Sequence, residues 1–238
     1  MPLPKVATPE FEIKLHSQDE PIKYRPFLMK EEKLLLMALE SKKEDTMINA
    51  VKTILSGCTL PGQKVDFDSL PLFDLEFWFL HLRAKSVGEV VKLLFKCDEC
   101  EEQTEVDINI DDVELFISEE HTSLIEITDD IKVEMKYPNI KQFSKFTNKT
   151  KLTESLFEMT RECIKTIYHN DEVFEAKVQT KKELDEFILS LRQEQFGKII
   201  NFFETMPKLN HTVLFDCNKC NKENIVIIQG IENFFLSS

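Results

Sequence analysis

Glycine is scarce in this chain, and its scarcity argues against the common phosphate-binding motifs. Only five glycines occur among 238 residues. No two of them lie close enough to form a glycine-rich loop that cradles a nucleotide phosphate. A Gly-x-Ser-x-Gly elbow and a His-Glu-x-x-His helix are also absent. The sequence therefore argues against the common enzyme classes, and we predict no catalytic residues and no small-molecule substrate.

Long apolar runs and an excess of positive charge are missing as well. The N-terminus shows no basic segment followed by an apolar one, so we expect no secretory signal and a location in the cytosol. The longest apolar stretches are far too short to span a bilayer. The formal net charge is -13, and an acidic chain repels phosphate backbones. We therefore expect neither a membrane nor a nucleic acid as partner.

The spacing of apolar residues predicts an α+β fold in which helices pack with antiparallel β-hairpins. Weak alternation over residues 10–25 predicts a hairpin, and helical spacing over 30–56 predicts two helices. The pattern Ser41-x-x-Glu44 has the form of a capping box and marks the start of the second helix. Residues 75–83 predict a short helix that is apolar almost all round, which belongs in a core or against a partner.

The second half of the chain switches from strands to helices. Residues 90–137 read as strands with a turn at Asp129-Asp130. Apolar residues then recur every three or four positions from Leu152 to Ile167, which predicts a helix. Thr180-x-x-Glu183 is a second capping-box pattern and starts another helix. A last helical segment is expected to end before Pro207.

Two stretches of the chain repeat one layout around a Cys-x-x-Cys pair. KLLFKCDECEEQTEVDINI (92–110) and TVLFDCNKCNKENIVIIQG (212–230) each have an apolar run, a Phe two residues before the first Cys, polar residues and a β-rich exit. A Cys-x-x-Cys turn, here called a knuckle, places two thiolates on one metal edge. Two knuckles complete a tetrahedral shell with Zn–S distances of about 2.3 Å. We therefore predict one zinc ion, bound by Cys97, Cys100, Cys217 and Cys220.

The gap between the knuckles, residues 101 to 216, is much longer than the roughly 15–20 residues usual in such sites. The matched flanks, not the spacing, carry the prediction. Four free thiols are the simplest alternative. Redox chemistry is disfavoured because neither pair opens a helix, and disulfides within each pair would be strained. Iron–sulfur ligation has no other support. A zinc ion with four protein ligands leaves no open position, so we expect a structural ion that joins the end of the chain to its middle.

The predicted knuckles define how we expect the chain to divide. Residues 1–89 form an N-terminal hairpin plus helices. Residues 90–137 and 207–238 form a discontinuous, β-rich, zinc-ribbon-like unit. Residues 138–206 form a helical segment. We expect these regions to pack into one compact domain overall, since 238 residues suffice for a substantial core.

The remaining candidates are weighed against plainer roles. Clustered carboxylates lie in polar, turn-like sequence and are expected to form a solvated face. Cys58 and Cys163 fall on apolar patterns and are expected in the core. Trp78 is a core residue first, and a partner-binding residue if its helix is peripheral. His211 is a possible substitute ligand, although a strand-surface position fits better. Two aromatic residues near the C-terminus, Phe234 and Phe235, either pack on their own protein or serve a partner as anchors.

Five segments occur in a characteristic order over nearly the whole chain. They are YRPFLMKEEKLLLMALES (24–41), LRAKSVGE (82–89), TDDIKVEMKYP (128–138), QFGKIINFFETMPKLNH (195–211) and GIENFF (230–235). In these segments and their order, the chain resembles the baseplate hub assembly family of T-even-like contractile-tailed bacteriophages.

The resemblance implies a non-enzymatic phage protein that is needed to build the central hub of the tail baseplate. Its expected partners are the baseplate hub proteins, and its expected locations are the cytoplasm of the infected host cell and, in the alternative, the virion baseplate. One reading is an assembly factor, or chaperone, that leaves the finished particle. A second is a permanent structural subunit. A third is a zinc-ribbon adaptor for a host complex, which the ribbon tips Asp98-Glu99 and Asn218-Lys219 do not favour.

Overall fold

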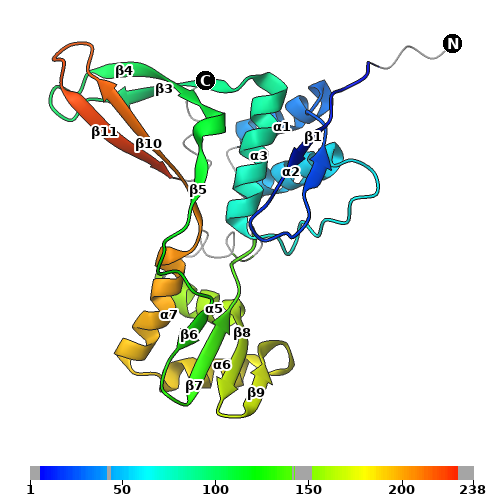
Figure 1. The fold of residues 1–238 in the computed structure, drawn as a ribbon, viewed down its shortest axis with the longest axis vertical. Coiled ribbons are helices and arrows are strands. Elements are labelled where there is room, and N and C mark those ends of the chain that lie inside the picture. The colour runs from blue at the N-terminus through cyan, green and yellow to red at the C-terminus, as the bar shows by residue number, and fades with distance from the viewer. Residues whose placement is uncertain (1–5, 42–43, 141, 143–151, 230–238) are drawn as a thin grey trace. The chain divides into compact units, whose positions relative to one another are not determined.

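The structure of the protein is a computed structural model that describes residues 6–41, 44–140, 142 and 152–229 (Figure 1). Its chain forms two compact units. Unit 1 comprises Met1–Phe116 and Lys208–Ser238, and unit 2 comprises Ile117–Pro207. The sequence predicted several regions that pack into one compact domain, with a boundary between two of these regions after residue 137. The structure instead places residues 117–137 in unit 2, because their strands pair with a strand further along the chain in that unit.

The N-terminal part of unit 1 contains the predicted hairpin and helices. Strands β1 and β2 pair antiparallel, with Phe11 opposite Tyr24. Helices α1 and α2 follow, and helix α3 carries the nearly all-round apolar segment. The expected capping box of α2 lies partly outside the described residues. The bounds are β1 Phe11–Ile13, β2 Ile22–Tyr24, α1 Met29–Ser41, α2 Glu44–Cys58 and α3 Leu72–Val87.

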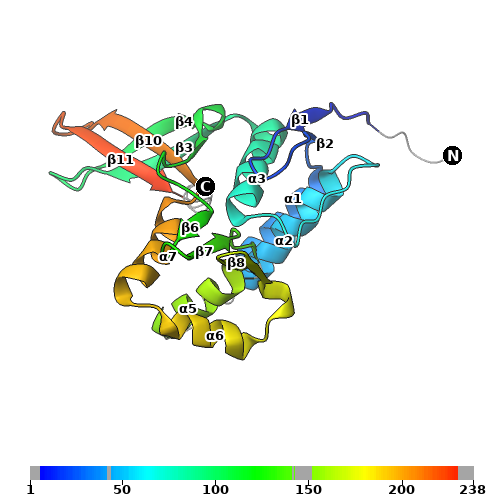
Figure 2. The same ribbon diagram turned by 60° about the horizontal axis from the view of Figure 1, so that its bottom comes forward.

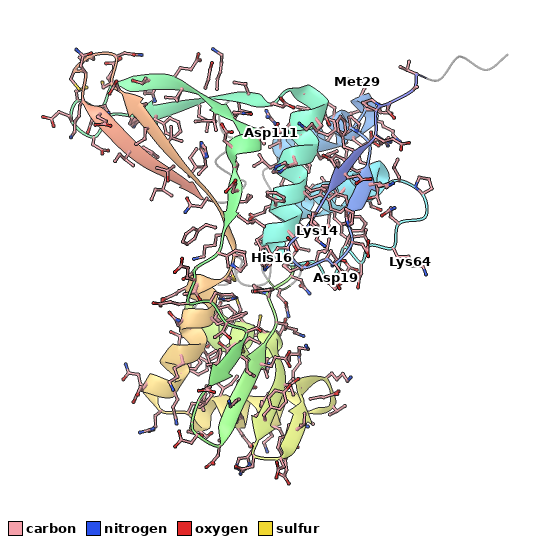
Figure 3. All side chains as sticks on the ribbon, in the orientation of Figure 1. Lys14, His16, Asp19, Met29, Lys64 and Asp111 are labelled. Carbon is pink, nitrogen blue, oxygen red and sulfur yellow. The ribbon has the colours of Figure 1, made fainter. Side chains whose placement is uncertain are left out.

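Helix α3 lies in the core of unit 1, and a buried carboxylate at its start connects it to the hairpin. Asp74 in its first turn is fully buried. Its two oxygens accept hydrogen bonds from the backbone N–H groups of His16 and Ser17, at 3.0 and 2.9 Å. Figure 3 shows His16 beside this end of α3. At the other end, Lys85 donates to Asp111 at 3.1 Å. Both contacts position α3 against the segments that precede and follow it.

Two antiparallel sheets complete unit 1. One is the hairpin of β3 and β4. The other has the order β11-β10-β5, so that the last two strands of the chain join a strand from its middle. The hairpins β3–β4 and β10–β11 lie side by side in both views (Figures 1 and 2). The bounds are β3 Val90–Lys96, β4 Gln103–Asn109, η1 Ile110–Asp112, β5 Glu114–Phe116, β10 Lys208–Asp216 and β11 Glu223–Gln229.

The inner faces of these hairpins share one apolar core with α3. Phe95 and Phe215, the two residues that precede the knuckles, stack with ring centroids 5.6 Å apart. The other members are spaced at every second strand position, as a half-buried strand requires. The buried members of this core include Leu80, Val91, Leu93, Ile108, Val213 and Ile228.

Unit 2 is a four-stranded antiparallel sheet of order β6-β7-β8-β9, accompanied by three described helices. The helix predicted through Ile167 ends at Cys163, and strand β8 begins at Ile164. Residues 164–169 (IKTIYH) are rich in β-branched and aromatic residues and pair on both sides, so sheet pairing overrides the helical spacing. The bounds are β6 Leu124–Glu126, β7 Ile131–Met135, α5 Leu152–Cys163, β8 Ile164–His169, β9 Glu172–Glu175, η2 Ala176–Val178, α6 Lys181–Ser190 and α7 Gln193–Thr205.

Two boundaries predicted in unit 2 are confirmed. Thr180 precedes α6 and forms the complete capping box with Glu183. Helix α7 ends at Thr205, two residues before Pro207, which cannot supply the N–H that a continuing helix needs. Among the described residues, no helix has the length and apolar content needed to cross a membrane.

Candidate metal centre

The first knuckle is a tight turn between β3 and β4. The backbone N–H of Cys97 donates to the carbonyl oxygen of Glu102 at 2.9 Å, and the N–H of Glu101 donates to that of Cys97 at 3.0 Å. Glu101 adopts the left-handed conformation, with φ of 57°. This conformation is uncommon for residues other than glycine, and here it reverses the chain after the second cysteine. The turn therefore directs Cys97 and Cys100 toward the same side.

The second knuckle, between β10 and β11, has the same geometry. The N–H of Cys217 donates to the carbonyl oxygen of Lys222, and the N–H of Asn221 donates to that of Cys217, both at 2.9 Å. Asn221 has φ of 55°, a conformation that asparagine tolerates better than most residues. The repeated layout in the sequence thus corresponds to a repeated turn in the structure.

Two buried polar side chains connect each knuckle to the opposite hairpin. Asn224 of β11 accepts a hydrogen bond from the backbone N–H of Asp98, at 3.1 Å. Thr104 of β4 lies 3.4 Å from the backbone N–H of Asn218 and accepts from it. Both side chains are buried. Sequence reasoning missed these residues, although each is the fourth after the second cysteine of its knuckle, and this shared position was a usable signal.

Two exposed ion pairs also connect the two knuckles at the surface. Lys219 lies 3.4 Å from Glu102, and Lys222 lies 3.2 Å from Glu99. Each pair joins one knuckle to the other. Exposed pairs of this kind contribute little to stability, but they place cations beside a cluster of thiols.

The four predicted cysteines come together. Their sulfur atoms all lie within 4.8 Å of one another. The Sγ–Sγ distance is 3.6 Å for Cys97–Cys220 and 3.5 Å for both Cys100–Cys217 and Cys100–Cys220. These distances far exceed a disulfide bond of about 2.05 Å. They are close to the edge of about 3.8 Å of a sulfur tetrahedron around a metal bound at about 2.3 Å. The donor set and its size therefore fit a metal ion such as zinc.

The thiols of each knuckle differ in acidity. Backbone N–H groups within each turn point at the first sulfur, lowering the pKa of Cys97 to about 6 and also that of Cys217. Backbone N–H groups favour the thiolates of Cys100 and Cys220 too, but burial and the adjacent thiols outweigh them. Both pKa values are raised, that of Cys220 to about 12. The thiolate, which is the form that binds metal, is thus favoured at the first cysteine of each knuckle.

Several other predicted positions have the plainer role. Cys58 and Cys163 are fully buried, and burial raises their pKa values to about 11 and about 12. Trp78 is fully buried in unit 1, the first of its two predicted roles, and stacks on Phe67 at 5.5 Å. His211 is partly buried on β10 and is not among the clustered ligands.

The structure describes the predicted acidic clusters but not the aromatic residues near the C-terminus. The carboxylates singled out in the sequence, such as Asp129 and Asp130, are exposed, as expected of a solvated face. Phe234 and Phe235 lie outside the described residues. Their predicted role stays a prediction.

The fold and the site define a class: an α+β protein in which two β-hairpins, distant in the sequence, meet at a four-cysteine cluster. The chain belongs to the family of T4 bacteriophage base plate proteins, whose family model matches residues 7–236. This confirms the resemblance to a T4-like phage baseplate family. No curated protein and no solved structure matches the chain significantly.

Proposed function

We propose that this protein is an assembly factor for the baseplate hub and acts by binding hub subunits in the cytoplasm of the infected cell. The observation that carries the proposal is the family match, which extends over nearly the whole chain. The acidic composition, with a net charge of -13, supports a role that keeps a sticky partner surface soluble. The proposal assigns no catalytic residues to the chain.

The same features fit a permanent subunit of the baseplate, so copy number decides between the two roles. Quantitative mass spectrometry of purified virions and of infected-cell lysate makes the comparison. An assembly factor is abundant in lysate and absent from virions. A constant copy number per virion, in proportion to a known baseplate protein, would overturn the assembly-factor role and establish a structural subunit.

We further propose that the four-cysteine cluster holds one structural zinc ion. When bound, zinc would supply four bonds to sulfur and join Cys100 to Cys217, which are 117 positions apart in the chain. Four protein ligands leave no open position for water or substrate. The role of these residues is then to hold two hairpins face to face, with Thr104 and Asn224 fixing the turn backbones.

Metal analysis of the purified full-length protein tests this assignment. We expect one zinc ion per chain by inductively coupled plasma mass spectrometry, and four thiols that resist alkylation until a chelator is added. Protein purified under reducing conditions with no bound metal, and with all four thiols alkylated at once, would contradict the proposal.

A further inference from the structure

The outer face of the β10–β11 hairpin is apolar and exposed. Residues of these strands alternate, so Val213 and Ile228 face the core while their neighbours face outward. Leu214, Ile225 and Ile227 are 62%, 63% and 56% exposed. Leu214 lies directly opposite Ile225, and Ile227 lies opposite Thr212, so the three side chains form one continuous patch.

The matching hairpin shows that a knuckle hairpin does not require such a face. On the outside of β3–β4, Lys92 pairs with Glu105 at 2.7 Å and with Asp107 at 3.7 Å. Leu94 is exposed there too, but its cross-strand neighbour is Glu105. The two hairpins thus share one sequence layout but differ in surface chemistry. Of the two outer faces, only that of β10–β11 has three large, exposed apolar residues next to one another.

An acidic pair borders the apolar patch. Asp216 and Glu223 lie directly opposite each other at the knuckle end of the hairpin, on the same outer face as Leu214 and Ile225. Both are exposed, and neither forms an ion pair with any residue that the structure describes. Like charges placed opposite each other across two strands are destabilising. A cation from a partner would neutralise this pair and relieve the repulsion.

Strand β11 also has an open edge. It is the outer strand of the order β11-β10-β5, and only β10 pairs with it among the described strands. Proteins usually block such edges with Lys, Pro or a bulge. The sequence ENIVIIQ contains no Lys or Pro, and its single charged residue is Glu223 at the knuckle end. Its pairing with β10 is regular over all seven positions, without a bulge. An extended segment is the ligand that hydrogen-bonds to such an edge.

We propose that this face, comprising Leu214, Ile225, Ile227 and the β11 edge, binds an extended apolar segment of another phage baseplate protein, with a Lys or Arg of that segment beside Asp216 and Glu223. The inference rests on the proposed function and names its binding surface. A second copy of this chain is the less favourable occupant, because two bodies with a net charge of -13 repel each other.

The test starts from pairwise co-expression of the full-length protein with each of the other baseplate proteins of the same phage. For the protein that co-purifies, calorimetry gives the dissociation constant. We expect the double variant Ile225→Thr, Ile227→Thr to weaken binding at least about 30-fold, since buried apolar anchors dominate binding energy. Asp216→Asn with Glu223→Gln should weaken binding and reduce its salt dependence. Threonine keeps a high strand propensity, so the fold is retained.

Leu94→Thr is the matched control, because Leu94 is 58% exposed on the outer face of the other hairpin. We expect its dissociation constant to stay within about twofold of the unchanged protein. Unchanged metal content and circular dichroism establish that each variant is folded. A baseplate protein that binds all face variants normally would overturn this inference and leave the proposed function standing. A failure of every baseplate protein to bind would count against both. A stable dimer that Ile227→Lys dissolves would assign the face to a second copy and overturn the inference.

Discussion

At the residue scale, buried charges fix the local geometry of unit 1. Arg25 and Glu31 are 2.9 Å apart, and their side chains are only 16% and 8% exposed. Arg25 also donates to the carbonyl oxygen of Gly57 at 2.7 Å, and Glu31 accepts from the N–H of Leu28 at 2.9 Å. One pair thus joins the end of β2, the start of α1 and the end of α2.

Replacing Glu31 should make stability less dependent on pH. Burial alone would raise the pKa of Glu31, but the hydrogen bonds from Arg25 and Leu28 outweigh it and hold that pKa below its ordinary value. The charged pair therefore stabilises the fold above the unfolded pKa of about 4.3 and loses its effect as the pH falls through the folded pKa. We expect Glu31→Gln to cost about 3 kcal/mol at neutral pH and less at about pH 3.5.

Urea unfolding of both proteins at the two pH values measures this difference. Glu12→Gln is the control, because Glu12 and Lys23 form an exposed pair with side chains 57% and 53% exposed. Such a pair contributes only about 0–1 kcal/mol. If Glu31→Gln lowered the free energy of unfolding equally at both pH values, its effect would come from changed packing rather than from the lost charge.

Cysteine substitutions separate metal binding from packing. Cys220 is exposed, so Cys220→Ser removes a ligand without disturbing the core. We expect it to lose the metal and to lower Tm by at least about 5 °C, because the bonds that join the two hairpins are lost.

The opposite pattern is expected for Cys163→Ala, which changes a fully buried residue of unit 2. It should destabilise the protein by about 1–3 kcal/mol through lost packing and retain one metal ion per chain. Metal analysis and thermal unfolding of both variants make the comparison. Retention of metal by Cys220→Ser would remove Cys220 from the ligand set.

At the element scale, capping and pairing decide where segments begin and change type. The Thr180 side chain accepts from the N–H of Glu183 at 3.3 Å, and the Glu183 carboxylate accepts from the N–H of Thr180 at 2.7 Å. These bonds satisfy N–H groups at the start of α6 that have no partner within the helix. The change from α5 to β8 at Ile164 depends instead on strands that pair with it.

Removing the cap should weaken α6. We expect Thr180→Ala to lower the free energy of unfolding by about 1 kcal/mol, the usual effect of losing an N-cap side chain. Urea unfolding is the measurement. Ser190→Ala, at the exposed C-terminal end of the same helix, should change it by less than about 0.5 kcal/mol. Equal effects of the two substitutions would contradict the role of the cap.

At the scale of the whole molecule, the chain builds two units with separate cores. The core of unit 1 combines α3 with the two hairpins, and that of unit 2 combines the β6–β9 sheet with α5, α6 and α7. The chain enters unit 2 after Phe116 and returns to unit 1 at Lys208. The four-cysteine cluster joins the outgoing and returning parts of unit 1.

Metal removal should therefore act on one unit. With a strong zinc chelator, we expect amide hydrogens of β10 and β11 to lose protection from exchange, while those of β7 and β8 keep it. The cause is that only unit 1 relies on the cluster to hold its segments together. Hydrogen exchange followed by mass spectrometry gives protection for each segment. A parallel loss in both units would show that they unfold as one.

The sequence by itself determined the local features. The hairpin over β1 and β2, the helices α1 to α3, the Thr180 cap and the end of α7 all follow from spacing, capping and proline. The clustering of the four cysteines follows from two matched stretches, because the same local layout forms the same turn. The baseplate family follows from the ordered segments and is confirmed by the family match.

Tertiary structure alone decided the division into units and the shared contacts. Ile164 and Ile167 fit a helical spacing, yet pairing with β7 and β9 makes their segment a strand. The segment 117–137 belongs to unit 2 for the same reason. Thr104 and Asn224 gain their roles only when the hairpins face each other. A local pattern can mark such a residue but does not identify its partner, because a contact between segments distant in the chain forms only when the chain folds.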